Sequence, residues 1–209
     1  MTDARWDLQE QCGNLDIYLF DQLLRGRLDP GMRVLDVGCG SGRNLVYLLR
    51  AGYEVFGLDP NPNAIDEVRQ LVATLAPHLP RDNFRVESIE DTSFPAAFAD
   101  VVLSSAVLHF ARDEAHFGAM LQGTWKALRP GGLFFCRLAS SIGMEQQVTS
   151  IAGRRHRLPD GSERFLVDEA LLMALTTGLH GELLDPLKTT IVHNQRSMTT
   201  WVVRKSGQS

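Results

Sequence analysis

The sequence predicts an α/β protein built on a doubly wound, mostly parallel sheet with helices on both faces. Two observations carry this prediction. Short apolar segments alternate with amphipathic segments four times before residue 139, and a glycine-rich turn follows the first apolar segment. Parallel strands are joined almost only by right-handed crossovers, so few arrangements of such a chain are available. The last two predicted strands are joined by a short link, so they should pair antiparallel.

Hydrophobic periodicity and end signals justify each element. Leu15, Leu19 and Leu23 recur at helical spacing, and Asn61-Pro62 supplies an N-cap followed by a proline at the first helical position. Consecutive apolar residues over 101–103 are typical of a strand buried on both faces. The predicted strands are 33–37, 54–58, 84–88, 100–105, 133–138, 182–187 and 198–204, and the predicted helices are 14–28, 43–51, one starting at Pro62, one from its cap Asp113 to 128 and one from its cap Asp168 to 177.

Length, charge and cysteine content limit the function classes. The 209 residues suffice for one α/β domain, and the formal net charge of −4 offers no general attraction to nucleic acid, so no nucleic-acid partner is expected. The three cysteines stand far apart without a C-x-x-C pair, so neither a disulfide framework nor a metal site is predicted. Charged residues interrupt the first twenty positions, and no apolar stretch is long enough to span a membrane. We therefore expect a cytoplasmic protein without membrane contact, either a monomer or a homodimer.

The strongest chemical signal is the turn after the first strand, which reads G-x-G-x-G over Gly38–Gly42 and includes Cys39 and Gly40. Small residues between a strand and a helix let the backbone approach a ligand, with N–H groups free to bind it. The spacing differs from the G-x-G-x-x-G of dinucleotide sites, and the acidic Asp36 beside it suits a ligand with an ammonium group and a sulfonium. The alternative is a tight turn that binds nothing.

A second signal is Asp59, at the end of the second strand and 21 residues after Gly38. In doubly wound sheets an acid at this point hydrogen-bonds the hydroxyls of a ribose. The alternative is a turn or cap residue before Pro60. The glycine-rich turn beside it favours the ribose interpretation.

Together these segments resemble the successive motifs of class I S-adenosylmethionine (SAM)-dependent methyltransferases. The matching segments are 34–42, 58–61, the acid-rich 87–91, 99–110 and 128–134, in the order and spacing of the family over about 30–138. The resemblance implies a Rossmann-like, seven-stranded sheet with an antiparallel last strand. It also implies SAM as cofactor and S-adenosylhomocysteine as product. One domain is expected over 1–209, with a cofactor-binding core over 30–138 and a substrate-side flap or insertion over 139–167.

The resemblance also implies a role for each matching position. Asp36 and the glycine-rich turn would face the methionine part of SAM, and Asp59 would hold the ribose. The remaining cofactor contacts would be Leu58 or Pro60 at the adenine slot, Ser88 and Ile89 at the adenine edge, and Ser104 and Ser105 near the methionine tail. Many relatives carry Asp at the position of Ser88, so Glu90 or Asp91 is a candidate replacement for that contact.

A narrower likeness concerns the acceptor. The segment 40–48 and the ending 198–205 look similar to the tellurite-resistance type of small methyltransferase, which implies a small-molecule acceptor. His109 follows the fourth strand at the edge where substrates sit in this architecture, so it is a candidate base or substrate contact. The alternative, which we favour, is a histidine that packs the following loop. His116 is predicted to be a solvated helix residue.

Further candidate substrate contacts follow the fifth strand. Arg137 could pair with a substrate carboxylate or bond a loop carbonyl, and Ser140 reaches the same edge. The polar stretch 153–164 predicts a hairpin or mobile flap. Its basic run, which includes Arg155, is either a solvated face or a device that recognises an anionic acceptor.

Two other function classes stay open. A nicotinamide-dependent oxidoreductase needs a catalytic Tyr-x-x-x-Lys or an equivalent, and none of the three tyrosines has lysine four residues on. A SAM-binding regulator or catalytically silent subunit would keep Asp36 and Asp59 but lack a usable acceptor pocket.

Overall fold

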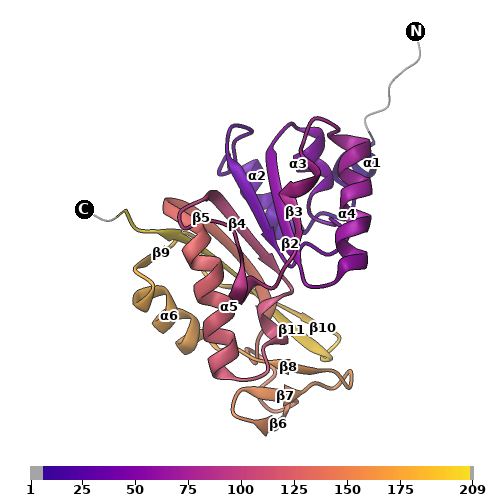
Figure 1. Cartoon of the computed structure of the whole chain (residues 1–209). Coiled ribbons are helices and arrows are strands. Elements are labelled where there is room, and N and C mark those ends of the chain that lie inside the picture. The colour runs from indigo at the N-terminus through magenta and orange to yellow at the C-terminus, as the bar shows by residue number, and fades with distance from the viewer. Residues whose placement is uncertain (1–6, 208–209) are drawn as a thin grey trace. The chain divides into compact units, whose positions relative to one another are not determined.

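The computed structural model describes residues 7–207, and the chain divides into two compact units, one ending at Ser88 and the other beginning at Ile89 (Figure 1). The single domain predicted over 1–209 therefore includes terminal residues outside the described part. Each unit contains part of the predicted α/β pattern and is described in turn.

The first unit has a parallel sheet in the order β1-β2-β3. Val34, Leu35 and Val37 of β1 are buried, as are the β2 residues Val55 and Leu58, because parallel strands are covered on both faces. The helices α3 and α4 pack against each other and against β2. The elements are α1 (Leu8–Cys12), α2 (Ile17–Leu24), β1 (Arg33–Val37), α3 (Val46–Arg50), β2 (Glu54–Asp59), α4 (Pro62–Leu75), η1 (Arg81–Asn83) and β3 (Phe84–Val86).

The second unit has strands in the order β10-β11-β5-β4, with β9 also paired to β11. β4 and β5 are parallel, whereas β11 is antiparallel to β5, β9 and β10. A separate three-stranded antiparallel sheet, β6-β7-β8, follows β5 in the chain. The elements are η2 (Ile89–Asp91), β4 (Ala99–Ser105), η3 (Leu108–Phe110), α5 (Glu114–Ala127), β5 (Leu128–Ala139), β6 (Thr149–Ala152), β7 (Arg155–Arg157), β8 (Glu163–Phe165), α6 (Glu169–Gly178), β9 (Gly181–Leu183), β10 (Lys188–Val192) and β11 (Arg196–Lys205).

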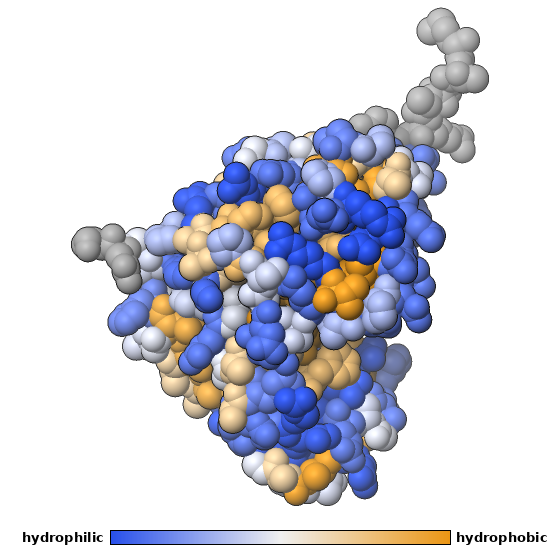
Figure 2. All heavy atoms as spheres, in the orientation of Figure 1, coloured by the Kyte–Doolittle hydropathy of each residue, from blue (hydrophilic) through white to orange (hydrophobic). Residues whose placement is uncertain are grey.

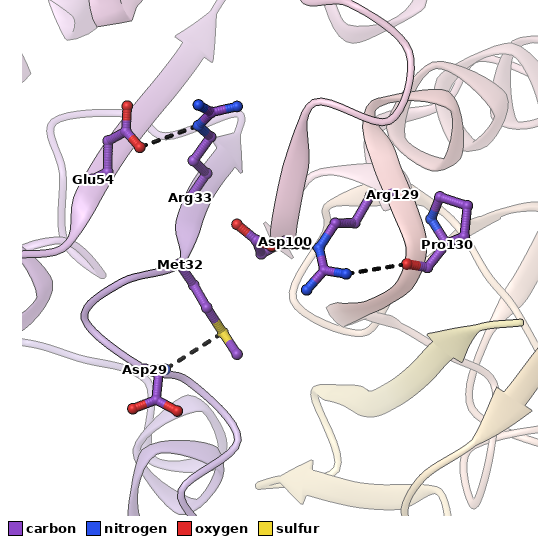
Figure 3. A network of polar contacts seen from close by, with 7 residues as sticks. All are labelled: Asp29, Met32, Arg33, Glu54, Asp100, Arg129 and Pro130. Carbon is purple, nitrogen blue, oxygen red and sulfur yellow. Dashed lines mark hydrogen bonds and ion pairs between the residues drawn. The ribbon is translucent and has the colours of Figure 1, made fainter. Parts of the chain in front are cut away.

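Ion pairs at the starts of neighbouring strands support the strand register in each unit (Figure 3). In the first unit Arg33 lies opposite Glu54, and its Nε donates to the Glu54 carboxylate at 3.1 Å. In the second unit Arg129 at the start of β5 pairs with Asp100 at the start of β4. These contacts lie at the amino ends of β1, β2, β4 and β5. The carboxyl ends of these strands carry the candidate site residues.

The boundaries of three predicted elements need correction. The predicted helix 14–28 is shorter in the structure and spans only α2 (Ile17–Leu24). Asp16 caps its start by accepting the Tyr18 N–H at 2.9 Å, and Gly26 with φ 65° follows its end. The predicted helix 43–51 begins only at Val46, since residues 43–45 form a turn. The predicted strand 84–88 stops at Val86.

The end of the chain holds a strand that the sequence did not predict. β10 forms a hairpin with β11 through a turn in which His193 and Asn194 have φ of 50° and 53°. The Gln195 N–H donates to the Val192 carbonyl at 2.9 Å and closes a β-turn with these two residues at its centre, where type I′ turns also have positive φ. The predicted strand 182–187 shortens to β9, and its predicted antiparallel pairing with the last strand is confirmed.

The predicted hairpin within 153–164 is present as β7 and β8, and β6 extends it on the other side of β7. Over residues 7–207, no helix is long and apolar enough to cross a lipid bilayer. The face of the molecule in Figure 2 is mainly hydrophilic, with apolar residues in small groups.

Candidate active site

The glycine-rich turn connects β1 to the turn before α3. Gly38, Gly40 and Gly42 all have positive φ, 70°, 52° and 89°, a backbone region that favours glycine. Gly42 also has no room for a side chain, because a Cβ there would lie 2.8 Å from Leu71 and 2.9 Å from Val68. The G-x-G-x-G spacing therefore follows from a backbone that turns left-handed at every second residue.

The expectation that the N–H groups of this turn are free to bind a ligand is wrong for four of them. Those of Gly38 and Cys39 donate to the Leu58 carbonyl at 2.8 and 3.0 Å, and that of Gly42 donates to the Cys39 carbonyl. The Gly40 N–H donates to a carboxylate oxygen of Asp59 at 3.0 Å. The three bonds to Leu58 and Asp59 fasten the turn to the end of β2, so the first two strand ends meet as the sequence predicts.

Asp59 occupies the centre of this arrangement. One carboxylate oxygen accepts the Gly40 N–H, and the other accepts the Asn61 N–H at 2.9 Å. The side chain is half-buried, and the following Pro60 is exposed. Asp59 thus has the turn role that the sequence left open. Each carboxylate oxygen has a further lone pair with which to accept a hydroxyl.

Asp36 lies in β1 two residues before the turn and is only 2% exposed. The pKa of this carboxyl is raised to about 7, mainly by burial; the positive charge of Arg43 opposes the shift, and the negative charge of Asp59 adds to it. A positively charged ligand group near Asp36 would favour the ionised form and stabilise the complex. The turn, Asp59 and Asp36 together form a small acidic site within the first unit.

The raised pKa of Asp36 predicts a pH-dependent stability. The folded protein holds this proton more tightly than the unfolded chain, so the favourable contribution is present below about pH 4 and is lost as pH rises to about 7. Relative to Asp36→Asn, the wild-type free energy of unfolding should fall by on the order of 2–4 kcal/mol between pH 4.5 and 8. Urea unfolding of both proteins across this range measures the difference, and a constant difference would contradict the assignment.

The comparison with Asp36→Asn is needed because His109 gives the free energy of unfolding the opposite dependence on pH. Burial, with a contribution from Arg164, lowers the pKa of His109 to about 4, so its contribution to stability is lost as pH falls below about 6.5. The two groups therefore partly offset each other in the wild-type pH profile. Asp36→Asn removes one of them and leaves the other.

Of the predicted adenine-edge residues, Ser88 is the last residue of the first unit and Ile89 is the first of the second. Ser88 is half-buried and Ile89 is buried at the start of η2. Glu90, a candidate replacement for the missing Asp, has its carboxylate 3.0 Å from Nε2 of His116, and this hydrogen bond helps to hold the pKa of Glu90 below its ordinary value. The candidate contact of Glu90 is thus already part of a pair, whereas Asp91 is exposed.

The prediction that His116 is a solvated helix residue is wrong. Its side chain is only 14% exposed, and Nδ1 accepts the Arg112 N–H at 3.1 Å while Nε2 meets Glu90. The same helix has Gly123 against η2, where a Cβ would lie 2.1 Å from the Ile89 carbonyl oxygen. α5 therefore holds the short segment that contains Ile89 and Glu90.

His109 lies in η3, after the carboxyl end of β4, and is 5% exposed. Its Nδ1 accepts the Ala139 N–H at 3.1 Å, which joins η3 to the end of β5. Because Nδ1 is an acceptor, the neutral ring carries its proton on Nε2. This geometry supports the packing role, and the catalytic role stays a prediction.

The remaining candidates of the second unit line the ends of β4 and β5. Ser104 is fully buried opposite Cys136, and Ser105 is half-buried opposite Arg137. Ser140 is also buried, and its hydroxyl lies 2.7 Å from the Thr199 hydroxyl and 3.2 Å from that of Ser197. A substrate contact of Ser140 would require this hydroxyl network to open.

Arg155 of β7 is half-buried and donates to Glu163 of β8 at 2.9 Å. Its neighbours Arg154 and Arg157 pair with Asp168 and Glu163. The basic run is therefore largely neutralised by acids within its own unit, which supports a solvated face over anion recognition. The substrate role of Arg155 stays a prediction.

Comparison with known proteins defines the class to which this fold and site belong. The chain matches the family model described as a methyltransferase domain over residues 35–136. It is 32% identical over 107 residues to an uncharacterized methyltransferase of Synechocystis sp., with 51% of this chain and 47% of that protein covered. It is also 32% identical over 154 residues to the ubiquinone biosynthesis O-methyltransferase of Methylobacterium sp., with 71% and 59% covered. The chain spans about half the length of the curated relatives it matches.

A solved structure shows the same fold at lower identity. The 1,6-didemethyltoxoflavin-N1-methyltransferase of Burkholderia thailandensis, determined with 1,6-didemethyltoxoflavin and S-adenosylhomocysteine, has a TM-score of 0.66 and 21% identity, with 88% of this chain and 75% of that chain covered. The predicted α/β Rossmann-like fold, mostly parallel with an antiparallel last strand, is confirmed. The chain belongs to the class I SAM-dependent methyltransferases.

Proposed function

We propose that this protein transfers the methyl group of SAM to a small-molecule acceptor. The observation that carries the proposal is the hydrogen bond from the Gly40 N–H to Asp59, which joins the two strand ends expected to hold the cofactor. The buried acid Asp36 beside them matches a ligand with an ammonium group and a sulfonium. The relatives support the same proposal, since those described above are named methyltransferases.

The residues present fit the cofactor. Asp36 and the turn Gly38–Gly42 would lie against the methionine part, and Asp59 would accept the ribose hydroxyls. Ser88 and Ile89 would meet the adenine edge, and Ser104 and Ser105 the methionine tail. In this division of labour 30–138 is the cofactor-binding core of a single domain, and 139–167 supplies a flap on the substrate side.

SAM supplies a carbon already activated by positive sulfur, so the protein contributes mainly alignment, for which about 7–11 kcal/mol is available in well-oriented systems. The neutral His109, with Nδ1 occupied by the Ala139 N–H, is a weak base. We infer that His109 positions the end of β5 and does not act as a strong base. The acceptor must then be one that loses its proton readily without such a base. Thiols and acidic hydroxyls meet this condition better than alkyl alcohols.

Turnover tests this function. The purified full chain is incubated with SAM and a panel of thiols, phenols, amines and small acids. S-adenosylhomocysteine should form faster than in reactions that lack the protein or the acceptor, with thiols or phenols favoured. Binding of SAM without turnover on any panel member would favour a SAM-binding, catalytically silent protein. Failure to bind SAM at all would contradict both.

A further inference from the structure

The arginines in and beside the three-stranded sheet β6-β7-β8 differ in whether they form an ion pair. Arg154, Arg155 and Arg157 each form an ion pair with a carboxylate, at 2.8 to 2.9 Å. Arg164 of β8 forms none within the part of the chain that the structure describes, and its Nη1 donates to the Glu163 carbonyl at 2.7 Å. The pKa of Asp160 is lowered mainly by hydrogen bonds from the N–H and hydroxyl of Ser162, and the charge of Arg164 lowers it further without an ion pair. Arg164 therefore keeps a net positive charge that no described acid neutralises by contact.

The guanidinium of Arg164 lies over an exposed aromatic ring. Its Cζ is 4.8 Å from the centroid of Phe110, and the Phe110 side chain is 58% exposed although it follows the buried His109. The His109 and Phe110 rings meet edge to face, with centroids 4.6 Å apart. Exposure of a phenylalanine ring to water is unfavourable, and packing against another group would remove that cost. Because a histidine and an arginine hold this ring in place, it is suited to pack against a bound ligand.

The position of this cluster connects it to the reaction. η3, which contains His109 and Phe110, follows the carboxyl end of β4, where substrates bind in open α/β sheets. β8 contacts η3, so the flap places Arg164 at that edge. The pKa of His109 is lowered partly by the charge of Arg164, which places the two groups within electrostatic reach of each other.

We propose that Phe110 and Arg164 form an acceptor-recognition site for a planar aromatic molecule that carries a carboxylate. The ring of such a molecule would stack with Phe110, and its carboxylate would pair with the Arg164 guanidinium in the bidentate geometry that arginine favours. This inference rests on the proposed methyl transfer and specifies its acceptor class. It reassigns anion recognition within the flap from Arg155 to Arg164.

Benzoate and its neutral isostere benzamide test the site in the full chain without SAM. Ligand-observed NMR titration should show benzoate binding to the wild type at least about tenfold more tightly than benzamide, since only the carboxylate forms a bidentate, charge-assisted pair with the guanidinium. Arg164→Gln should remove that preference, and Phe110→Ala should weaken both ligands. Arg157→Gln, a surface arginine of the same sheet that is paired with Glu163, should leave both affinities within about twofold of wild type.

Equal binding of benzoate and benzamide, no binding of either, or an equal loss in Arg157→Gln would each overturn the inference. The thermal shift given by S-adenosylhomocysteine is measured on the same proteins. Its absence in the wild type would contradict the proposed function, whereas its retention in Arg164→Gln alongside lost benzoate binding would support the acceptor site separately.

Discussion

Replacing Asp59 by alanine is expected to weaken the binding of S-adenosylhomocysteine by at least about a hundredfold, because two hydrogen bonds to a charged group are each worth on the order of 1.5–3 kcal/mol. The two ribose hydroxyls are the partners assigned to this carboxylate. Asp59 also accepts the N–H groups of Gly40 and Asn61, so the variant loosens the glycine-rich turn as well. Isothermal titration measures the affinity, and thermal unfolding reports the structural part of the effect.

A ligand lacking one hydroxyl separates the two contributions. The 2′-deoxy analogue of S-adenosylhomocysteine should bind wild type more weakly than the parent, whereas Asp59→Ala should bind both equally. Asp66→Ala serves as the matched control, because Asp66 is an exposed acid of the same unit with ion pairs to Arg69 and Arg81. An equal preference for the 2′-hydroxyl in wild type and Asp59→Ala would remove the ribose assignment.

Replacing Gly123 by alanine is expected to destabilise the fold by about 2–3 kcal/mol or more, since an added group that meets backbone forces the structure to shift. The new Cβ would lie 2.1 Å from the Ile89 carbonyl oxygen and 3.4 Å from the Cα of Glu90. The segment η2 must then move away from α5, and the His116–Glu90 contact moves with it. We also expect weaker S-adenosylhomocysteine binding, because Ile89 is assigned to the adenine edge.

Gly118 provides a control in the same helix. No atom lies within 4 Å of the Cβ position at Gly118, so Gly118→Ala should stabilise α5 by up to about 1 kcal/mol through the higher helix propensity of alanine. Urea unfolding of the two variants compares a blocked and an open site on one helix. Equal stability of Gly118→Ala and Gly123→Ala would contradict the close approach of η2 to α5.

The backbone arrangement of the proposed cofactor site was predictable from sequence because its signals are local. Three glycines at alternate positions permit a left-handed backbone, and Asp59 ends a strand that neighbours them. What the sequence does not show is how the N–H groups of the turn are used. Four of them bond within the first unit, and three of these bonds depend on the approach of Leu58 and Asp59 from another strand.

The missed features depend on contacts between distant residues or on unusual turn residues. β10 escaped prediction because its hairpin turn uses His193 and Asn194 at positive φ, where Asn-Gly would have been recognisable. His116 looked like a solvated residue because its partner Glu90 lies 26 positions earlier. The pairing of Phe110 with Arg164 likewise joins the segment after β4 to the flap.

The most direct test of the central claim is a calorimetric comparison of S-adenosylhomocysteine and NAD binding to the full chain. The account predicts saturable one-to-one binding of S-adenosylhomocysteine, tightened as pH rises through about 7 because a cationic ammonium group favours ionised Asp36. It predicts no measurable binding of NAD at the same concentrations. Binding of NAD without S-adenosylhomocysteine would contradict the claim that the first two strand ends cradle an adenosine with a charged methionine tail.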